Sequence, residues 1–103
     1  MRKAVVVGGS GFIGSHVADR LSDSGFQVTI YDKNKSQWLR PDQKMVIGDI
    51  LDIDKLNRTI SDAEVVYNFA ALSDINQALR QSIKTVNINI LGNLNVMEAC
   101  HAH

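Results

Sequence analysis

The chain has 103 residues, of which 45% are hydrophobic and 21% charged, and its 11 basic and 11 acidic residues cancel. This length holds at most one domain, and zero net charge argues against bulk binding of nucleic acid or an anionic membrane. The single cysteine, Cys100, excludes an internal disulfide and fits a reducing compartment. No stretch approaches the roughly twenty apolar residues of a membrane span. We therefore expect a cytoplasmic protein with no nucleic-acid or membrane partner.

The apolar pattern predicts strands and helices that alternate along the chain. The β-branched run Lys3–Val7 predicts a strand buried on both faces. Residues 12–24 predict a helix, in which Ile13, Val17 and Leu21 recur four apart. The other expected features are a helix C-cap at Gly25, strands at Gln27–Asp32, Lys44–Ile47 and 64–69, a loop at 33–43, and helices at 52–60 and from about residue 75.

Since no hairpin signal interrupts this alternation, the sheet is expected to be parallel. Right-handed crossovers then place the strands in the order 3-2-1-4. The predicted fold is a Rossmann-like, doubly wound α/β sheet that is partial, because it has four strands.

Four glycines fall within seven residues, at the turn between the first strand and the first helix. Two spacings fit: Gly9, Gly11 and Gly14 spell G-x-G-x-x-G, whereas Gly8 in place of Gly9 gives G-x-x-G-x-x-G. In either, Gly11 lets the backbone approach phosphates and Gly14 lets the helix pack closely on the strand. The start of a helix also favours negative charge. We therefore predict that residues 8–14 bind a dinucleotide pyrophosphate, and the lack of a following Gly-Lys-Ser/Thr excludes a P-loop.

An acidic residue ends the second predicted strand. Asp32 follows Gly14 by 18 residues, where a carboxylate can accept hydrogen bonds from the ribose hydroxyls of adenosine. Its charge would repel a 2′-phosphate, which favours NAD over NADP. Lys33 and Asn34 follow directly and are candidate cofactor contacts, although Lys33 and Lys35 are expected to be too well solvated to accommodate a phosphate. A tight structural turn without a ligand is the alternative interpretation of the glycines.

Together these residues resemble a known family. The stretch Gly-Gly-Ser-Gly-Phe-Ile-Gly-Ser-His, at residues 8–16, resembles the cofactor loop of extended short-chain dehydrogenase/reductases. These are the NAD-dependent epimerases and dehydratases, which mostly act on nucleotide sugars. Three further segments resemble the family in the expected order: Gly48-Asp49-Ile50, Asn68-Phe69-Ala70-Ala71, and residues 86–100. Asn68 stands where the family usually has histidine.

The resemblance implies roles for single residues. Phe12 and Ile13 belong to the cofactor loop, the Asp49 carboxylate would bond the adenine amino group, and the Ile50 N–H would bond a ring nitrogen. Three residues, Phe69, Ala70 and Ala71, would line the cofactor ribose and pyrophosphate. Asn89 would hold a water near the proton relay. The plainer interpretations stay open: Asp49 as a turn acceptor, Asp52 as a helix N-cap, Asn89 as an ordinary polar helix residue.

The family's chemistry needs a tyrosine with a lysine four residues later on one helix face. Tyr31 and Lys35 have this spacing, but Tyr31 ends a strand, where residues four apart lie about 13 Å from one another. The other tyrosine, Tyr67, precedes Ala71 by four. We therefore expect no catalytic residue in residues 1–103, apart from support by Asn89. The chain is interpreted as an incomplete N-terminal NAD(P)-binding domain that lacks the catalytic helix and the substrate domain.

Two functions from different classes remain. The first is the NAD-binding part of an NAD-dependent nucleotide-sugar epimerase or dehydratase, with NAD as cofactor, a nucleotide sugar as substrate of the complete protein and a homodimer as candidate assembly. The second is a non-catalytic NAD(P)-binding sensor or regulatory module of the same fold, which would lack a downstream Tyr-x-x-x-Lys helix. A structural domain with a vestigial loop would bind no NAD. No metal site is expected, and His16 is expected to be partly buried near the glycine loop.

Overall fold

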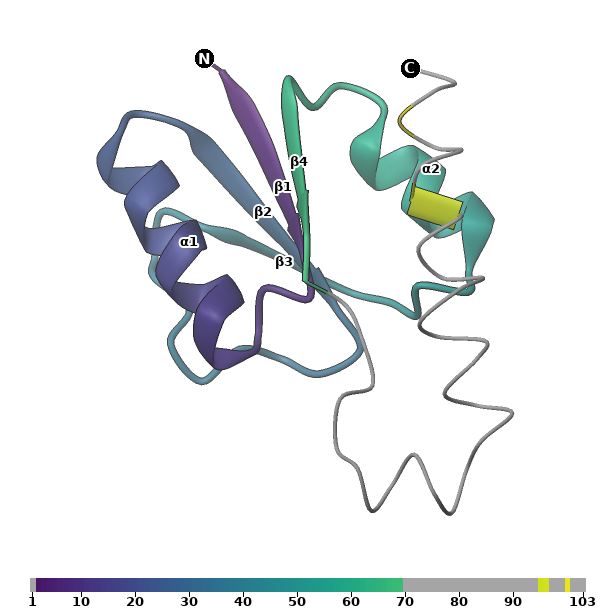
Figure 1. Cartoon of the computed structure of the whole chain (residues 1–103), viewed down its shortest axis with the longest axis horizontal. Helices are drawn as coiled ribbons and strands as arrows, with labels where there is room; N and C mark the ends of the chain where they lie inside the picture. Colours follow the sequence, from purple (N-terminus) through teal and green to yellow (C-terminus); the bar gives the residue numbers. More distant parts are fainter. Residues whose placement is uncertain (1, 70–94, 97–99, 101–103) are drawn as a thin grey trace.

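A computed structural model describes residues 2–69, 95, 96 and 100. Within this part of the chain the elements are, in order, β1 (Lys3–Val7), α1 (Phe12–Asp23), β2 (Gln27–Asp32), β3 (Lys44–Ile47), α2 (Ile53–Ile60) and β4 (Val65–Asn68). The strands pair in parallel, in the order β3-β2-β1-β4 (Figure 1). This confirms the predicted parallel sheet and its 3-2-1-4 order. The helix expected from about residue 75 lies outside the described residues, apart from helical positions at 95, 96 and 100.

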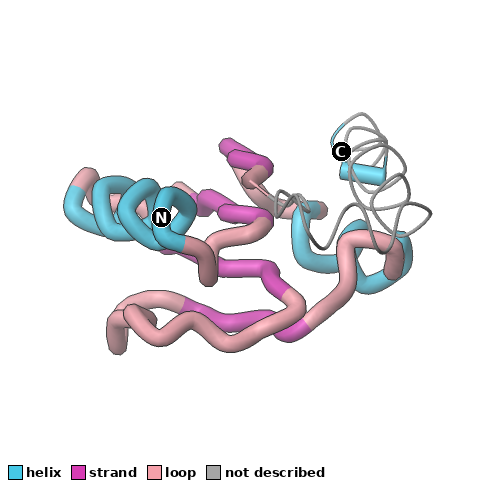
Figure 2. The backbone as a smooth tube through the Cα atoms, turned by 60° about the horizontal axis from the view of Figure 1, so that its bottom comes forward, coloured by secondary structure: helices cyan, strands magenta, loops and turns pink. Residues whose placement is uncertain are grey.

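Helices cover both faces of the sheet, with α1 on one face and α2 on the other (Figures 1 and 2). Strand β1 is buried on both faces, as predicted, because its alternating side chains enter two separate apolar clusters. Val6 packs with Ala18 of α1 in one cluster. Val5 and Val7 belong to the other cluster, which also contains Leu56 of α2, Tyr31, Ile50, Ile60 and Val96.

Only part of the apolar stripe predicted for α1 packs on the sheet, where Leu21 contacts the cluster that contains Val6 and Ala18. Ile13 is 65% exposed, whereas the small residues Gly14, Ser15 and Ala18 are buried. A side chain at Gly14 would place its Cβ 2.5 Å from the Gly8 carbonyl oxygen. The helix therefore approaches β1 closely along a line of small residues, which turns Ile13 toward solvent. The expectation for His16 was also wrong, since this side chain is exposed on the outer face of the helix.

The end of α1 is the predicted glycine cap. Gly25 adopts a φ of 93°, and its N–H donates to the Ser22 carbonyl at 3.1 Å. The Phe26 N–H donates to the Leu21 carbonyl at 3.1 Å, which completes a Schellman motif. Within the described part of the chain, no helix has the length and apolarity needed to cross a bilayer.

Replacement of Leu56 should test the core beneath α2. Leu56 is fully buried, so Leu56→Ala removes buried methyl groups and should lower the free energy of unfolding by about 3 kcal/mol. Ile53, one turn earlier on α2, is 36% exposed, and Ile53→Ala should change stability by only about 0.5 kcal/mol. Urea unfolding of both variants measures the difference. Equal losses would contradict the assignment of Leu56 to the core.

Candidate dinucleotide-binding site

The predicted site residues that the structure describes gather at one edge of the sheet, where all four parallel strands end (Figure 1). Hydrogen bonds beyond the strands hold this edge together. The Gly8 N–H donates to the Tyr31 carbonyl at 2.8 Å, and the Gly48 N–H donates to the Asp32 carbonyl at 2.9 Å. The Phe69 N–H donates to the Val7 carbonyl at 2.7 Å. The loops after the strands are thus placed by the sheet itself, at the edge where open α/β sheets bind ligands.

Three of the four glycines are needed by the fold. Gly8 has a φ of 78°, in the left-handed region that side chains disfavour. A Cβ at Gly9 would lie 2.8 Å from Ile30 Cγ2 and 3.0 Å from the Val6 carbonyl oxygen. Gly14 packs against the loop, because its own Cβ would collide with the Gly8 carbonyl oxygen. Gly8 therefore makes the turn, while Gly9 is required by its packing against β1 and β2.

Gly11 is different, because the fold does not require its lack of a side chain. Its φ of −76° and ψ of 172° suit any residue, and among the described residues an added Cβ would meet the Gly8 carbonyl oxygen, at an ordinary 3.6 Å. Gly11 is exposed and forms the N-cap of α1. A bare residue at this position leaves room for something outside the protein to approach the backbone.

The start of α1 presents backbone N–H groups beside Gly11. No side chain of the described residues caps the helix, and its first turn contains no acidic residue. The first hydrogen bond of the helix runs from the Ser15 N–H to the Gly11 carbonyl at 2.9 Å. The N–H groups of Phe12, Ile13 and Gly14 therefore have no acceptor within the helix. They concentrate positive potential beside Gly11, which is the environment that a phosphate needs.

Asp32 lies beside this turn and connects two loops. Its Oδ2 accepts from the Ser10 N–H and its Oδ1 from the Asn34 N–H, each at 3.0 Å. The Ser10 hydroxyl donates to the Asn34 carbonyl at 2.5 Å. A carboxylate oxygen has two lone pairs, so each oxygen can accept one further hydrogen bond from a ligand hydroxyl. Lys33 and Lys35 are exposed, as expected, and Asn34 contributes its backbone to the arrangement.

Asp49 accepts hydrogen bonds within the turn that follows β3. Its Oδ1 accepts from the Leu51 N–H at 2.9 Å, and its carbonyl accepts from the Asp52 N–H at 3.0 Å. Among the described residues, Asp49 Oδ2 and the Ile50 N–H make no hydrogen bond. The same turn therefore retains one acceptor and one donor that no described residue occupies. The Asp52 side chain accepts from the Lys55 N–H at 3.2 Å, which confirms the predicted N-cap of α2.

Tyr31 has no role as a general base in this arrangement. Its ring is 1% exposed, and its hydroxyl donates to the Asp49 carbonyl at 2.7 Å. Burial, together with the carboxylates of Asp52 and Asp49, raises the pKa of Tyr31 to about 12. The phenol therefore stays protonated at neutral pH. Tyr31 is the last residue but one of β2. Because it lies in a strand, Tyr31 and Lys35 do not share one face of a helix, as a Tyr-x-x-x-Lys catalytic pair would.

At the end of β4, the rings of Tyr67 and Phe69 stack, with centroids 6.4 Å apart and an interplanar angle of 1°. Phe69 is 39% exposed and lies at the edge of the sheet where the parallel strands end. Three other predicted site residues, Ala70, Ala71 and Asn89, lie outside the described residues.

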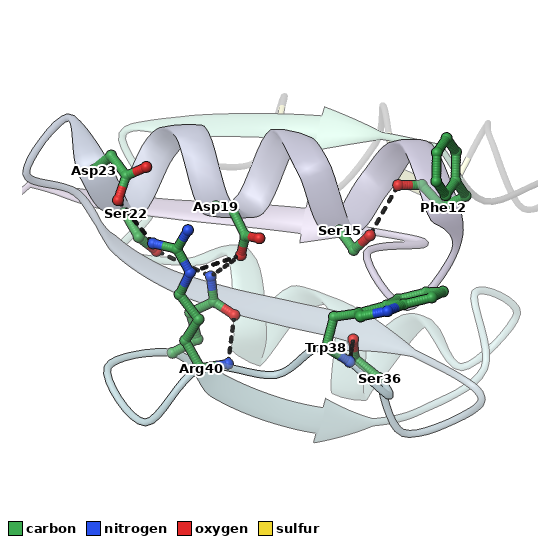
Figure 3. Close-up of polar contacts among 9 residues, drawn as sticks. Phe12, Ser15, Asp19, Ser22, Asp23, Ser36, Trp38 and Arg40 are labelled. Atoms are coloured by element: carbon green, nitrogen blue, oxygen red, sulfur yellow. Dashed lines mark hydrogen bonds and ion pairs between the residues drawn. The ribbon is translucent and has the colours of Figure 1, made fainter.

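The loop between β2 and β3 is anchored on α1, a feature that no sequence pattern predicted (Figure 3). The Gln43 side-chain amide donates to Asp19 and to Ser22, each at 3.0 Å. Arg40 pairs with Asp19 at 3.2 Å and with Asp23 at 2.7 Å. No motif signals these contacts, because the partners come from an element that precedes the loop by about twenty residues. These contacts fix the loop that follows Asp32 against α1.

Residues 4–103 match the model of the NAD dependent epimerase/dehydratase family. The chain belongs to this family. It is similar to a UDP-glucose 4-epimerase of Neisseria meningitidis serogroup B (34% identity, 95% of this chain and 32% of that protein). It is also similar to a UDP-N-acetyl-alpha-D-glucosaminuronate decarboxylase of Bacillus cytotoxicus (31% identity, 95% and 32%). Among solved structures, UDP-glucose 4-epimerase from Brucella ovis in complex with NAD matches with a TM-score of 0.87 (31% identity, 97% and 32%).

Membership of the epimerase/dehydratase family confirms the resemblance predicted from the motifs. The chain spans about a third of the length of these relatives. It is similar in nearly equal measure to an epimerase and to a decarboxylase, which carry out different reactions.

Proposed function

We propose that this chain is the NAD-binding part of a nucleotide-sugar epimerase or dehydratase. The observation that carries the proposal is Gly11: a glycine that the fold does not need, at the open start of α1, beside the carboxylate of Asp32. A structural turn would require only the glycines that the packing demands. The bare Gly11 is explained by a ligand that lies against the backbone, and the family and the NAD complex of a similar epimerase point to NAD.

The residues at the edge of the sheet fit such a ligand group by group. The N–H groups of Phe12, Ile13 and Gly14 would bind the pyrophosphate, helped by the positive end of α1. Asp32 would accept hydrogen bonds from the adenosine ribose, near the backbone of Lys33 and Asn34. The acceptor and donor at Asp49 and Ile50 match the edge of adenine. The remaining proposed contacts are Phe69, Ala70, Ala71 and Asn89.

NAD, when bound, supplies the capacity to accept a hydride from a sugar carbon and return it. The described residues would hold the cofactor and orient it, while the substrate of the complete protein would be a nucleotide sugar. The similar epimerase and decarboxylase act on UDP sugars by their names, which makes a UDP sugar the first substrate to test.

Binding of NAD should stabilise the folded protein, because a ligand that binds only the folded state shifts the unfolding equilibrium. At a free NAD concentration of a hundred times Kd, the expected gain is about 2.7 kcal/mol. Urea unfolding with and without NAD measures it, and nicotinamide mononucleotide, which lacks the adenosine, serves as the matched ligand control. Unchanged stability at every NAD concentration would overturn the proposed function.

Residues 1–103 alone should show no epimerase, dehydratase or dehydrogenase turnover with UDP-glucose and NAD. Of the two tyrosines, Tyr31 is buried and protonated, and Tyr67 has alanine four residues later. Chromatographic analysis of the sugar products provides the measurement. Turnover above background would show that another residue in this chain acts as the base.

A further inference from the structure

Tyr31 connects two loops at the edge of the sheet where the strands end, one through its backbone carbonyl and the other through its phenol. Its backbone carbonyl accepts from the Gly8 N–H at 2.8 Å, at the start of the glycine loop. Its phenol donates to the Asp49 carbonyl at 2.7 Å, in the turn after β3. The ring is 1% exposed and packs within the apolar cluster on the α2 face of the sheet. A buried hydroxyl without a hydrogen bond is costly, so the bond to the Asp49 carbonyl stabilises the buried phenol.

The ring and the turn fit each other closely. A Cβ at Gly48 would lie 2.6 Å from both Cζ and the hydroxyl oxygen of Tyr31, so only glycine lets the turn approach the phenol. The Gly48 N–H donates to the Asp32 carbonyl at 2.9 Å, and the Lys55 Nζ donates to the Ile47 carbonyl at 2.8 Å. The chain is therefore fixed as it leaves β3, and the phenol fixes the next peptide.

The Asp49 carbonyl and the Ile50 N–H belong to the same peptide unit. None of the described peptide bonds is cis, so the carbonyl and the N–H of this peptide lie in one plane and point in opposite directions. By holding the carbonyl toward the core, the phenol turns the Ile50 N–H away from it. That N–H makes no hydrogen bond to any described residue.

We propose that Tyr31 is a positioning residue for the adenine end of the dinucleotide, which acts by fixing the orientation of the Asp49–Ile50 peptide. This inference rests on the proposed function. The Ile50 N–H offers a donor and Asp49 Oδ2 offers an acceptor, which together suit a base that carries a ring nitrogen beside an amino group. The raised pKa keeps the phenol a donor across the pH range in which the protein would work.

Tyr31→Phe tests the proposal, because it removes the hydroxyl and keeps the ring that packs on Gly48. We expect the Kd for NAD and the Kd for AMP to rise by similar factors, about fivefold, which is the usual contribution of one hydrogen bond. The Kd for nicotinamide mononucleotide should not change. The matched control is Tyr67→Phe, since Tyr67 is 41% exposed and should leave all three values unchanged. Calorimetry on the full-length protein provides the values.

A second measurement follows the turn without a ligand. The Asp52 N–H donates to the carbonyl that the phenol holds, so hydrogen exchange at Asp52 should become faster in Tyr31→Phe. Wild-type affinity for NAD and AMP in that variant, or unchanged exchange at Asp52, would overturn the positioning role. An equal loss of affinity for nicotinamide mononucleotide would also overturn it, because that pattern indicates general damage. If the wild-type protein binds neither NAD nor AMP, the proposed function fails first.

Discussion

Gly11→Val should reduce NAD affinity by more than about a hundredfold, or about 2.7 kcal/mol, while the sheet stays folded. The backbone of Gly11 has dihedral angles that valine tolerates, and its Cβ would have an ordinary contact 3.6 Å from the Gly8 carbonyl oxygen. Valine is a poorer N-cap than glycine, which costs about 0.5 to 1 kcal/mol of stability. The larger effect falls on the ligand, because the side chain occupies the space beside the N–H groups that start α1. Calorimetric titration of NAD measures the affinity, and circular dichroism checks the fold.

A variant at Gly14 distinguishes loss of ligand binding from loss of protein stability. A Cβ at Gly14 would lie 2.5 Å from the Gly8 carbonyl oxygen and 2.8 Å from Gly9 Cα, so Gly14→Ala should destabilise the protein itself. Gly11→Ala, in contrast, should fold normally and lose less affinity than Gly11→Val. Normal NAD affinity in Gly11→Val would refute the pyrophosphate site.

Asp32 should give at least a tenfold preference for NAD over NADP, which corresponds to about 1.4 kcal/mol. A 2′-phosphate would bring two negative charges against the carboxylate in a half-buried position. At about 4 Å even a well-screened like-charge pair costs about 1 kcal/mol, and a partly buried pair several times more. Lys33 and Lys35 are exposed and so are poorly placed to offset this repulsion. Asp32→Ser should therefore narrow or reverse the preference, as measured by competitive titration of both dinucleotides.

Two further variants separate charge from hydrogen bonding at this position. Asp32→Asn removes the charge but keeps one acceptor oxygen, so it should improve NADP binding relative to NAD. Because Asp32 also accepts from the Ser10 and Asn34 N–H groups, the serine variant should lose some affinity for both ligands. Asp54→Asn, on the exposed first turn of α2, removes an equal charge elsewhere and should leave the ratio unchanged. Equal wild-type affinities for NAD and NADP would refute the role of Asp32.

Local patterns were sufficient to predict the elements of residues 2–69 and their strand order. The run Lys3–Val7 alternates into both clusters, and Gly25 ends α1 in a Schellman motif, because hydrophobic period and backbone freedom act over a few residues. The handedness of crossovers then determines the order of parallel strands. The same rule brings the glycine turn, Asp32 and Asp49 to one edge of the sheet, since parallel strands all end there.

Only the tertiary structure decided which atoms contact one another at that edge. The motif left open whether Gly8 or Gly9 makes the turn, because the need for glycine at each position arises from backbone angles and from atoms across the packed turn. The exposure of Ile13 follows from how closely α1 approaches β1, which is a property of the interface. The bond from Tyr31 to Asp49 joins residues 18 positions apart. In the sequence, Tyr31 drew attention only by its spacing to Lys35, which its place in a strand excludes as a catalytic pair. Such contacts depend on distances between elements, and a pattern along one chain does not contain them.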